Sequence, residues 1–407
     1  MRKDWKSSRP KISIESLASE VRTLYSRNEN ISDEEIKDLC RKTVEDKKEL
    51  WYLDQNEREK IIRLTYCSLR CELEILQDLA DDPDISEIMV NGIDHVFYEK
   101  HGRIIRSDIE FENRAQLEQI IQRLAARVSR EINDLNPILD ARLSDGSRVN
   151  AVHSNIAING PILTIRKFTN RKMSMDELIQ KGDITREAAD FLKMLIEAKY
   201  NIFVSGGTSS GKTTFLNVLS DYIPPGERLI VIEDSAELAI RGQENLVRME
   251  SKAANAQGKG AVTIKDLIKS SLRMRPDRII VGEVRGDEVI DMLAAMSTGH
   301  DGSLSTGHAN SPAGMIGRLE TLHIAASGFP MQAVRSQIAG AIDIFVHLSR
   351  FSGGHRKVTE ISETKSIENG EIILNRLFVY DEKEGLIRTG NELIHRQKLE
   401  RLQSLSS

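Results

Sequence analysis

One stretch, residues 201–219, constrains the fold of this 407-residue chain more than any other. A short apolar run, Ile202 to Val204, leads into the pattern G-x-x-x-x-G-K-T, which begins at Gly206 and ends at Thr213. Glycines let the backbone turn tightly, so that several N–H groups converge on one phosphate, and the following helix adds its positive dipole end. A plain glycine- and serine-rich turn would look similar, but the flanking strand and helix favour a phosphate loop.

The residue types in this loop indicate which ligand it takes. Lys212 can reach the β- and γ-phosphates of a nucleotide, and the Thr213 hydroxyl can ligate Mg²⁺. We therefore expect ATP and Mg²⁺ as cofactors. The residues predicted to contact the nucleotide are Gly206, Gly207, Thr208, Ser209, Ser210, Gly211, Lys212, Thr213 and Thr214.

Composition limits the class of protein. With 40% hydrophobic and 29% charged residues, the chain is typical of a globular protein of two or three domains. A net charge of −5 and the lack of an aromatic-basic tract argue against nucleic acid as a partner. No apolar run has transmembrane length and no signal-peptide core follows Met1, so we predict no integral membrane segment. The three cysteines, Cys40, Cys67 and Cys71, fit a reducing cytoplasm, with buried thiols favoured over a metal pair.

Patterning along the chain predicts four segments. Ser32 to Glu35 forms a capping-box sequence, and residues 57–79 form an amphipathic run; these helices could dock a partner or only support the next domain. Strands alternate with helices after the phosphate loop, which predicts an α/β fold with a mostly parallel sheet. The predicted segments are a helical N-terminal extension (1–80), a small α+β domain (81–168), a polar linker (169–174) and the α/β domain (175–407).

Two downstream strands end in carboxylates. One ends at Glu233-Asp234 and the other at Gly282-Glu283. Metal-assisted phosphoryl transfer uses one acid on the Mg²⁺ side and another to orient the attacking water. Gly282 occupies the usual first acidic position, so we predict that Glu283 polarises water and that Glu233 or Asp234 supplies the metal-side acid. Two solvated strand ends are the ordinary alternative.

Two of the nine histidines, His300 and His308, each follow a glycine on a segment of small residues before a helix that begins near Ser311. A histidine here could sense the γ-phosphate and relay its presence to that helix. The pair could equally be turn histidines bonded to backbone carbonyls, and the chemistry alone leaves both interpretations open.

Taken in order, these motifs resemble those of the type II/type IV secretion and pilus-assembly ATPases. Two further stretches, 139–150 and 311–320, look like the subgroup that serves Flp (tight-adherence) pili. The resemblance covers about residues 81–350. The matching motifs are the phosphate loop (206–213), the aspartate box (232–238), an atypical second acidic motif (275–286) and the histidine box (298–312).

This resemblance implies a C-terminal RecA-like ATPase domain and an N-terminal domain, arranged in a hexameric ring with nucleotide between the domains. It implies an ATP-hydrolysing motor at the cytoplasmic face of the inner membrane, which assembles Flp-type pili through a platform protein of that membrane and could also retract them. It also implies that arginines of the N-terminal domain reach the phosphates; Arg148 and Arg166 occupy the matching stretches, with Arg142 as a third candidate. The assigned catalytic residues are Glu283, Glu233, Arg148, Arg166 and His308, and the assigned metal ligands are Thr213 and Glu233.

Other functions fit parts of the same pattern. A type II/IV secretion ATPase would export protein or DNA with the same residues, and a weakly hydrolysing nucleotide switch would use residues 1–80 to dock partners. A switch does not need a water-polarising Glu283, and the acidic net charge weighs against a nucleic-acid translocase.

Overall fold

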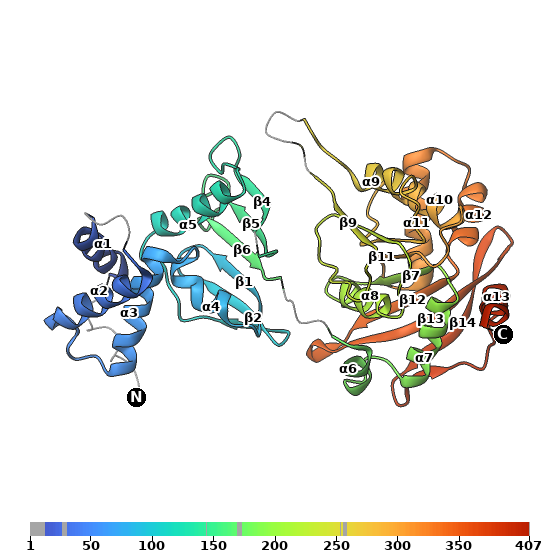
Figure 1. The fold of residues 1–407 in the computed structure, drawn as a ribbon, viewed down its shortest axis with the longest axis horizontal. Coiled ribbons are helices and arrows are strands. Elements are labelled where there is room, and N and C mark those ends of the chain that lie inside the picture. Colours follow the sequence, from blue (N-terminus) through green and yellow to red (C-terminus); the bar gives the residue numbers. More distant parts are fainter. Residues whose placement is uncertain are drawn as a thin grey trace. The chain divides into compact units, whose positions relative to one another are not determined.

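The computed structural model describes residues 13–26, 31–143, 145–168, 173–252, 254 and 259–406. The chain divides into two compact units, Met1–Thr169 and Asn170–Ser407, which we call unit 1 and unit 2 (Figure 1). The predicted linker, 169–174, lies outside the described residues except for its last two positions. The fold class predicted from the sequence is confirmed: helices precede a small antiparallel sheet, and a larger mixed sheet follows.

Unit 1 begins with three helices, α1 (Ile14–Tyr25), α2 (Asp33–Asp46) and α3 (Gln55–Arg70), which share a cluster of buried apolar side chains. The predicted capping box at the start of α2 is present, because Ser32 and Glu35 cap each other's backbone N–H groups. The helix expected over residues 57–79 is interrupted: α3 stops at Arg70, and η2 (Glu74–Leu76) and α4 (Gln77–Asp81) follow. The C-cap of α3 is Cys71, where the backbone becomes extended, and three residues later Glu74 takes a left-handed φ of +46° and turns inward to pair with Arg123.

The rest of unit 1 is a six-stranded antiparallel sheet in the order β3-β2-β1-β6-β5-β4. Helix α5 (Arg114–Arg127) packs on one face through Leu117, Ile120 and Leu124. The turn sequences at Asn91-Gly92 and at residues 143–150 predict two hairpins, and both are present, β1 with β2 and β4 with β5. The short edge strand β3 was not predicted because all its residues are exposed and leave no alternating pattern. The strands are β1 (Ile85–Asn91), β2 (Val96–Lys100), β3 (Arg103–Arg106), β4 (Ile138–Arg142), β5 (Arg148–Val152) and β6 (Ile162–Arg166).

Unit 2 is built on a nine-stranded sheet in the order β15-β14-β13-β12-β7-β11-β10-β8-β9. The six neighbouring strands β12, β7, β11, β10, β8 and β9 pair in parallel. On the other side of β12, strands β13, β14 and β15 extend the sheet with antiparallel pairing. The strands are β7 (Ile202–Gly206), β8 (Leu229–Glu233), β9 (Leu246–Glu250), β10 (Arg278–Val281), β11 (Leu304–His308), β12 (Ile344–Arg350), β13 (Arg356–Glu368), β14 (Glu371–Asp381) and β15 (Gly385–Arg388). The helices are α6 (Met175–Gln180), α7 (Arg186–Glu197), α8 (Lys212–Ser220), α9 (Ile264–Ser271), α10 (Val289–Ser297), α11 (Pro312–Ser327), α12 (Met331–Ala341) and α13 (Gln397–Ser406).

Strand β7 lies in the middle of this sheet and is buried on both faces. Val204 packs with α7 and α8 in one core cluster, and Phe203 packs with α10, α11 and α12 in the other. At the start of β7, the side chain of Asn201 bonds four backbone groups of neighbouring segments. Parallel strands bring their carboxyl ends to one edge, so the residues after β7, β8, β10 and β11 gather there. No helix among the described residues combines the length and apolar composition needed to cross a membrane.

Candidate active site

The phosphate loop joins β7 to α8 at the carboxyl edge of the sheet (Figure 1). Ser209 and Gly211 take left-handed φ angles of +57° and +93°, and this alternation turns successive N–H groups toward one point. A Cβ at Gly206 would lie 2.5 Å from Ser210 Oγ and 2.6 Å from the Leu348 carbonyl oxygen, so glycine is required there. The hydroxyl of Ser210 is buried without a hydrogen-bond partner among the described residues.

Lys212 opens α8, and its side chain is only 7% exposed. Its Nζ donates to the carbonyls of Gly206 at 3.2 Å and Gly207 at 3.1 Å, so the amine lies inside the curve of the loop. Burial lowers the pKa of Lys212, and the nearby carboxylate of Glu283 opposes that shift. A cation held among N–H groups and partly stripped of water is suited to bind phosphate oxygens.

His308, at the end of β11, lies between Lys212 and Glu283. Its Nδ1 is 3.1 Å from Lys212 Nζ, and its Nε2 is 2.9 Å from Glu283 Oε1. An ammonium group only donates, so Nδ1 accepts and the ring proton belongs on Nε2. Burial lowers the pKa of His308, which favours this neutral ring. The three residues therefore form a chain from the phosphate loop to the acid after β10.

Glu283 follows β10 at the same edge. Its Oε2 pairs with the Arg285 guanidinium at 2.9 Å. Its Oε1 is buried and, despite the short approach of His308, has no aligned hydrogen bond among the described residues. The preceding Gly282 carbonyl accepts from the Thr306 hydroxyl at 2.7 Å, which fixes the turn that carries the acid. A carboxylate oxygen oriented in this way can accept a proton from water.

Glu233, at the end of β8, is 3% exposed and lies against Gly282. Its Oε1 accepts hydrogen bonds from the backbone N–H groups of Glu237 and Leu238, both at 2.8 Å. Burial raises the pKa of Glu233 to about 7, although these two hydrogen bonds and Arg248 oppose the shift. The side chain thus holds the loop after β8 with one oxygen, and its metal-side role stays a prediction. Asp234 is exposed and bonds the Ser251 hydroxyl.

The donor set fits a magnesium nucleotide. The first N–H groups of α8 have no intrahelical acceptors, and its N-cap, Gly211, offers no capping side chain. Lys212 supplies a cation, and Thr213 supplies a half-buried hydroxyl at the position expected for a Mg²⁺ ligand. The buried Ser210 hydroxyl, which has no hydrogen-bond partner among the described residues, lies within this loop and could contact the phosphates.

The candidate arginines of unit 1 form a row across its sheet. Arg142 lies opposite Arg148 on neighbouring strands, and Arg148 lies opposite Arg166. The residues between them in sequence, such as Val149 and Ile165, face the core, so the row lies on the face away from α5. Like charges placed directly opposite each other destabilise a sheet, and Glu87 of β1, opposite Arg166, supplies one compensating acid. Contact of these arginines with phosphate stays a prediction.

Two basic residues near the site were not singled out from the sequence. Arg285 lies in the second acidic motif, and its place in that motif was an available signal. Arg356 donates from Nε to the Ser209 carbonyl at 3.0 Å, across a sequence separation that no local pattern reveals.

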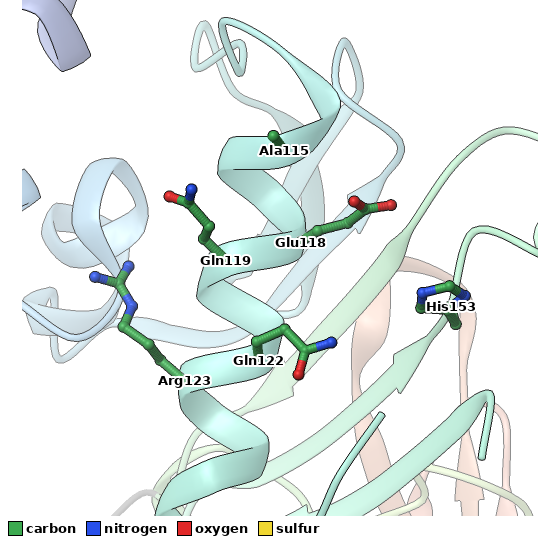
Figure 2. Close-up of a pocket in the computed structure, with 6 residues that line it drawn as sticks. All are labelled: Ala115, Glu118, Gln119, Gln122, Arg123 and His153. Atoms are coloured by element: carbon green, nitrogen blue, oxygen red, sulfur yellow. The ribbon is translucent and has the colours of Figure 1, made fainter. Parts of the chain in front are cut away.

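One hollow of the structure, of about 470 Å³, lies away from the phosphate loop. It lies in unit 1 beside α5 and is lined by Ala115, Glu118, Gln119, Gln122, Arg123 and His153. Figure 2 shows Glu118 and Gln122 directed toward His153, whereas Gln119 and Arg123 point away from it. The hollow is open to solvent and contains none of the predicted site residues.

The fold and site geometry together define a phosphate-loop nucleotide-binding protein. A family model described as "Type II/IV secretion system protein" matches residues 71–376, and the chain belongs to this family. A putative conjugal transfer protein of Mycobacterium tuberculosis is 35% identical over 300 residues, which cover 72% of this chain and 85% of the relative. The type IV secretion system protein PtlH of Bordetella pertussis is 32% identical over 320 residues, covering 72% and 94%.

Solved structures show the same fold. The Legionella pneumophila ATPase DotB matches with a TM-score of 0.51 and 18% identity, covering 76% of this chain and 80% of that one. The pilus retraction motor PilT, solved with ADP, matches with a TM-score of 0.50 and 18% identity, covering 82% and 88%. At this identity the likeness concerns the fold alone.

Proposed function

We propose that this protein is an ATP-hydrolysing motor of a type II/IV secretion machine that exports protein or DNA. The observation that carries the proposal is the chain Lys212–His308–Glu283, which places the carboxylate of Glu283 next to a phosphate loop. The names of the relatives, conjugal transfer and type IV secretion proteins, support export better than pilus assembly.

The residues of the site divide the work of hydrolysis. Lys212 exchanges its bonds to loop carbonyls for bonds to the β- and γ-phosphates, and the N–H groups of α8 hold the same anion. Glu283 accepts a proton from the attacking water, and Arg285 and His308 keep its carboxylate in place. Mg²⁺, held by Thr213 with Glu233 as the candidate second acid, would neutralise charge on the phosphates.

The arginine row of unit 1 supplies the remaining positive charge. We infer that Arg148 and Arg166 approach the phosphates when the units close on ATP, and that closure in a hexameric ring converts binding energy into domain rotation. A location at the cytoplasmic face of the inner membrane, against a membrane platform protein, belongs to the same proposal.

Replacing Glu283 with glutamine tests the site. The glutamine variant should bind ATP with the affinity of the parent and lose turnover by roughly 100-fold or more, because an amide cannot take the proton from water. Turnover is measured as phosphate release with and without Mg²⁺, beside nucleotide affinity. Near-parent turnover in E283Q would remove Glu283 from the proposed role, and strong stimulation by single-stranded DNA would favour a translocase.

A second candidate is assembly of Flp-type pili, which is favoured by the stretches 139–150 and 311–320 and their resemblance to that subgroup. An experiment in the cell can distinguish export from pilus assembly. A chromosomal Lys212→Ala replacement should abolish export of protein or DNA while sparing surface pili if the main proposal holds. Loss of pili with intact export would favour the second candidate.

A further inference from the structure

The hairpin between β12 and β13 extends beside the phosphate loop. β12 runs parallel to β7 with Leu348 in register with Gly206, and it continues to Arg350. β13 then returns antiparallel, with Arg356 opposite Arg350. The hairpin thus carries Arg356 past the carboxyl end of β7, on the side of that strand opposite β11.

The Arg356 side chain lies across the loop. Its Nε donates to the carbonyl of Ser209 at 3.0 Å. Its Cδ is 3.2 Å from the position that a Cβ would take at Gly211. The two contacts reach from Ser209 to Gly211, the N-cap of α8. Ser209 and Gly211 are the two residues of the loop with left-handed φ angles.

The charge of Arg356 is not neutralised by a neighbour. In the part of the chain that the structure describes, no carboxylate lies within ion-pair distance of its guanidinium, and its side chain makes a single hydrogen bond, that to Ser209. The buried carboxyl group of Asp183 interacts electrostatically with Arg356 but forms no ion pair with it among the described residues. A guanidinium has five N–H donors, and the bond from Nε leaves its terminal fork available.

We propose that Arg356 is a second cationic ligand of the nucleotide's phosphate chain, alongside Lys212. This inference rests on the proposed function, since it needs the loop to bind phosphate. Lys212 meets the phosphates from the buried side as a point charge. Arg356 meets them from the exposed rim with a planar fork, which suits two phosphate oxygens at once.

Binding measurements on Arg356→Ala and Arg356→Lys test the proposal. The probes are the magnesium complexes of a non-hydrolysable ATP analogue, of ADP and of inorganic tripolyphosphate, each titrated at several salt concentrations. R356A should weaken all three about tenfold, with a shallower salt dependence because one cation no longer contacts the anion. R356K should recover part of the affinity. The matched control is Lys357→Ala, because the Lys357 amine bonds the Tyr380 hydroxyl at 3.1 Å instead; it should bind like the parent.

Three results would overturn the proposal. Parent-like affinity of R356A for all three probes would show that Arg356 makes no contact with the ligand. A loss confined to the ATP analogue and ADP would place Arg356 at the base or ribose. An equal loss with unchanged salt dependence would mean that Arg356 only fixes the conformation of Ser209. Lys212→Ala is measured in parallel. If K212A also binds the probes like the parent, the proposed function itself fails. If K212A loses affinity and R356A does not, only the role of Arg356 is rejected.

Discussion

Replacing Glu233 with glutamine should stabilise unit 2 progressively as the pH rises from about 4.5 to about 7. The carboxyl group is 3% exposed, and burial raises its pKa to about 7 from an ordinary 4.5. A raised pKa means that the folded protein binds this proton more tightly than the unfolded chain does. The stability contributed by the protonated group is therefore complete below the unfolded pKa and is lost as the pH rises through the folded one.

The two pKa values differ by about 2.5, and at about 1.4 kcal/mol for each pKa unit the complete loss is roughly 3 to 4 kcal/mol. A glutamine does not titrate, and its carbonyl oxygen can still accept from the N–H groups of Glu237 and Leu238. Any fixed cost of the substitution is the same at every pH. The stability of E233Q relative to the parent should therefore increase by roughly 3 kcal/mol between pH 4.5 and pH 8.

Hydrogen exchange of the amides in β8 measures this difference. β8 lies between β9 and β10, so its amides exchange through opening of the surrounding sheet. Both proteins have the same intrinsic amide exchange rates at a given pH, so the ratio of their measured exchange rates reports the difference in stability. A difference of roughly 3 kcal/mol slows exchange by about two orders of magnitude. Asp234→Asn, at an exposed neighbouring carboxylate, is the control and should give a constant ratio. A constant ratio for E233Q as well would refute the reasoning.

The same measurement distinguishes the two roles considered for Glu233. A carboxylate that ligates Mg²⁺ must be ionised, so Mg²⁺ with an ATP analogue would lower its pKa and move the pH dependence downward. A carboxylate that only caps the N–H groups of Glu237 and Leu238 would show the same pH dependence with and without the metal nucleotide.

Arg148→Ala and Arg166→Ala should spare ATP binding and depress turnover, roughly tenfold each, since their charge matters once the site closes; unchanged turnover in both, measured as phosphate release, would separate unit 1 from catalysis. His308→Ala should lower turnover roughly 100-fold by releasing Glu283 and Lys212, with little loss of affinity, whereas His300→Ala should behave like the parent. Asn201→Ala should destabilise unit 2 by about 3 kcal/mol or more in urea unfolding, because four backbone groups lose their buried partner; a change under 1 kcal/mol would contradict this.

Where the signal was local, the sequence was a sufficient guide to the fold. The strand–loop–helix around Gly206, the acidic ends of β8 and β10 and the hairpins of unit 1 depend on residues close together in the chain. Strand pairing between residues far apart in the chain was harder to predict from the sequence. The antiparallel strands β13, β14 and β15 were not predicted, although they place Arg356 beside the phosphate loop.

The helix expected over 57–79 failed for a related reason. Its apolar periodicity continues through Leu73 and Ile75, so the local pattern gives no cause for a break. The break is favoured by a distant partner, because Glu74 turns inward to pair with Arg123 of α5. A pairing between residues so far apart leaves no mark on the local spacing from which the helix was predicted.

His300 and His308 show most clearly what only the fold could decide. Both follow a glycine and stand before the same helix, so their sequence signatures are alike. His300 approaches the carbonyl of Ala295 at 3.2 Å, which is the ordinary role of a turn histidine. His308 falls at the last position of β11, and this strand lies between β7 and β10. Because one neighbour carries the phosphate loop and the other carries Glu283, the strand order alone puts a neutral imidazole between the lysine and the acid.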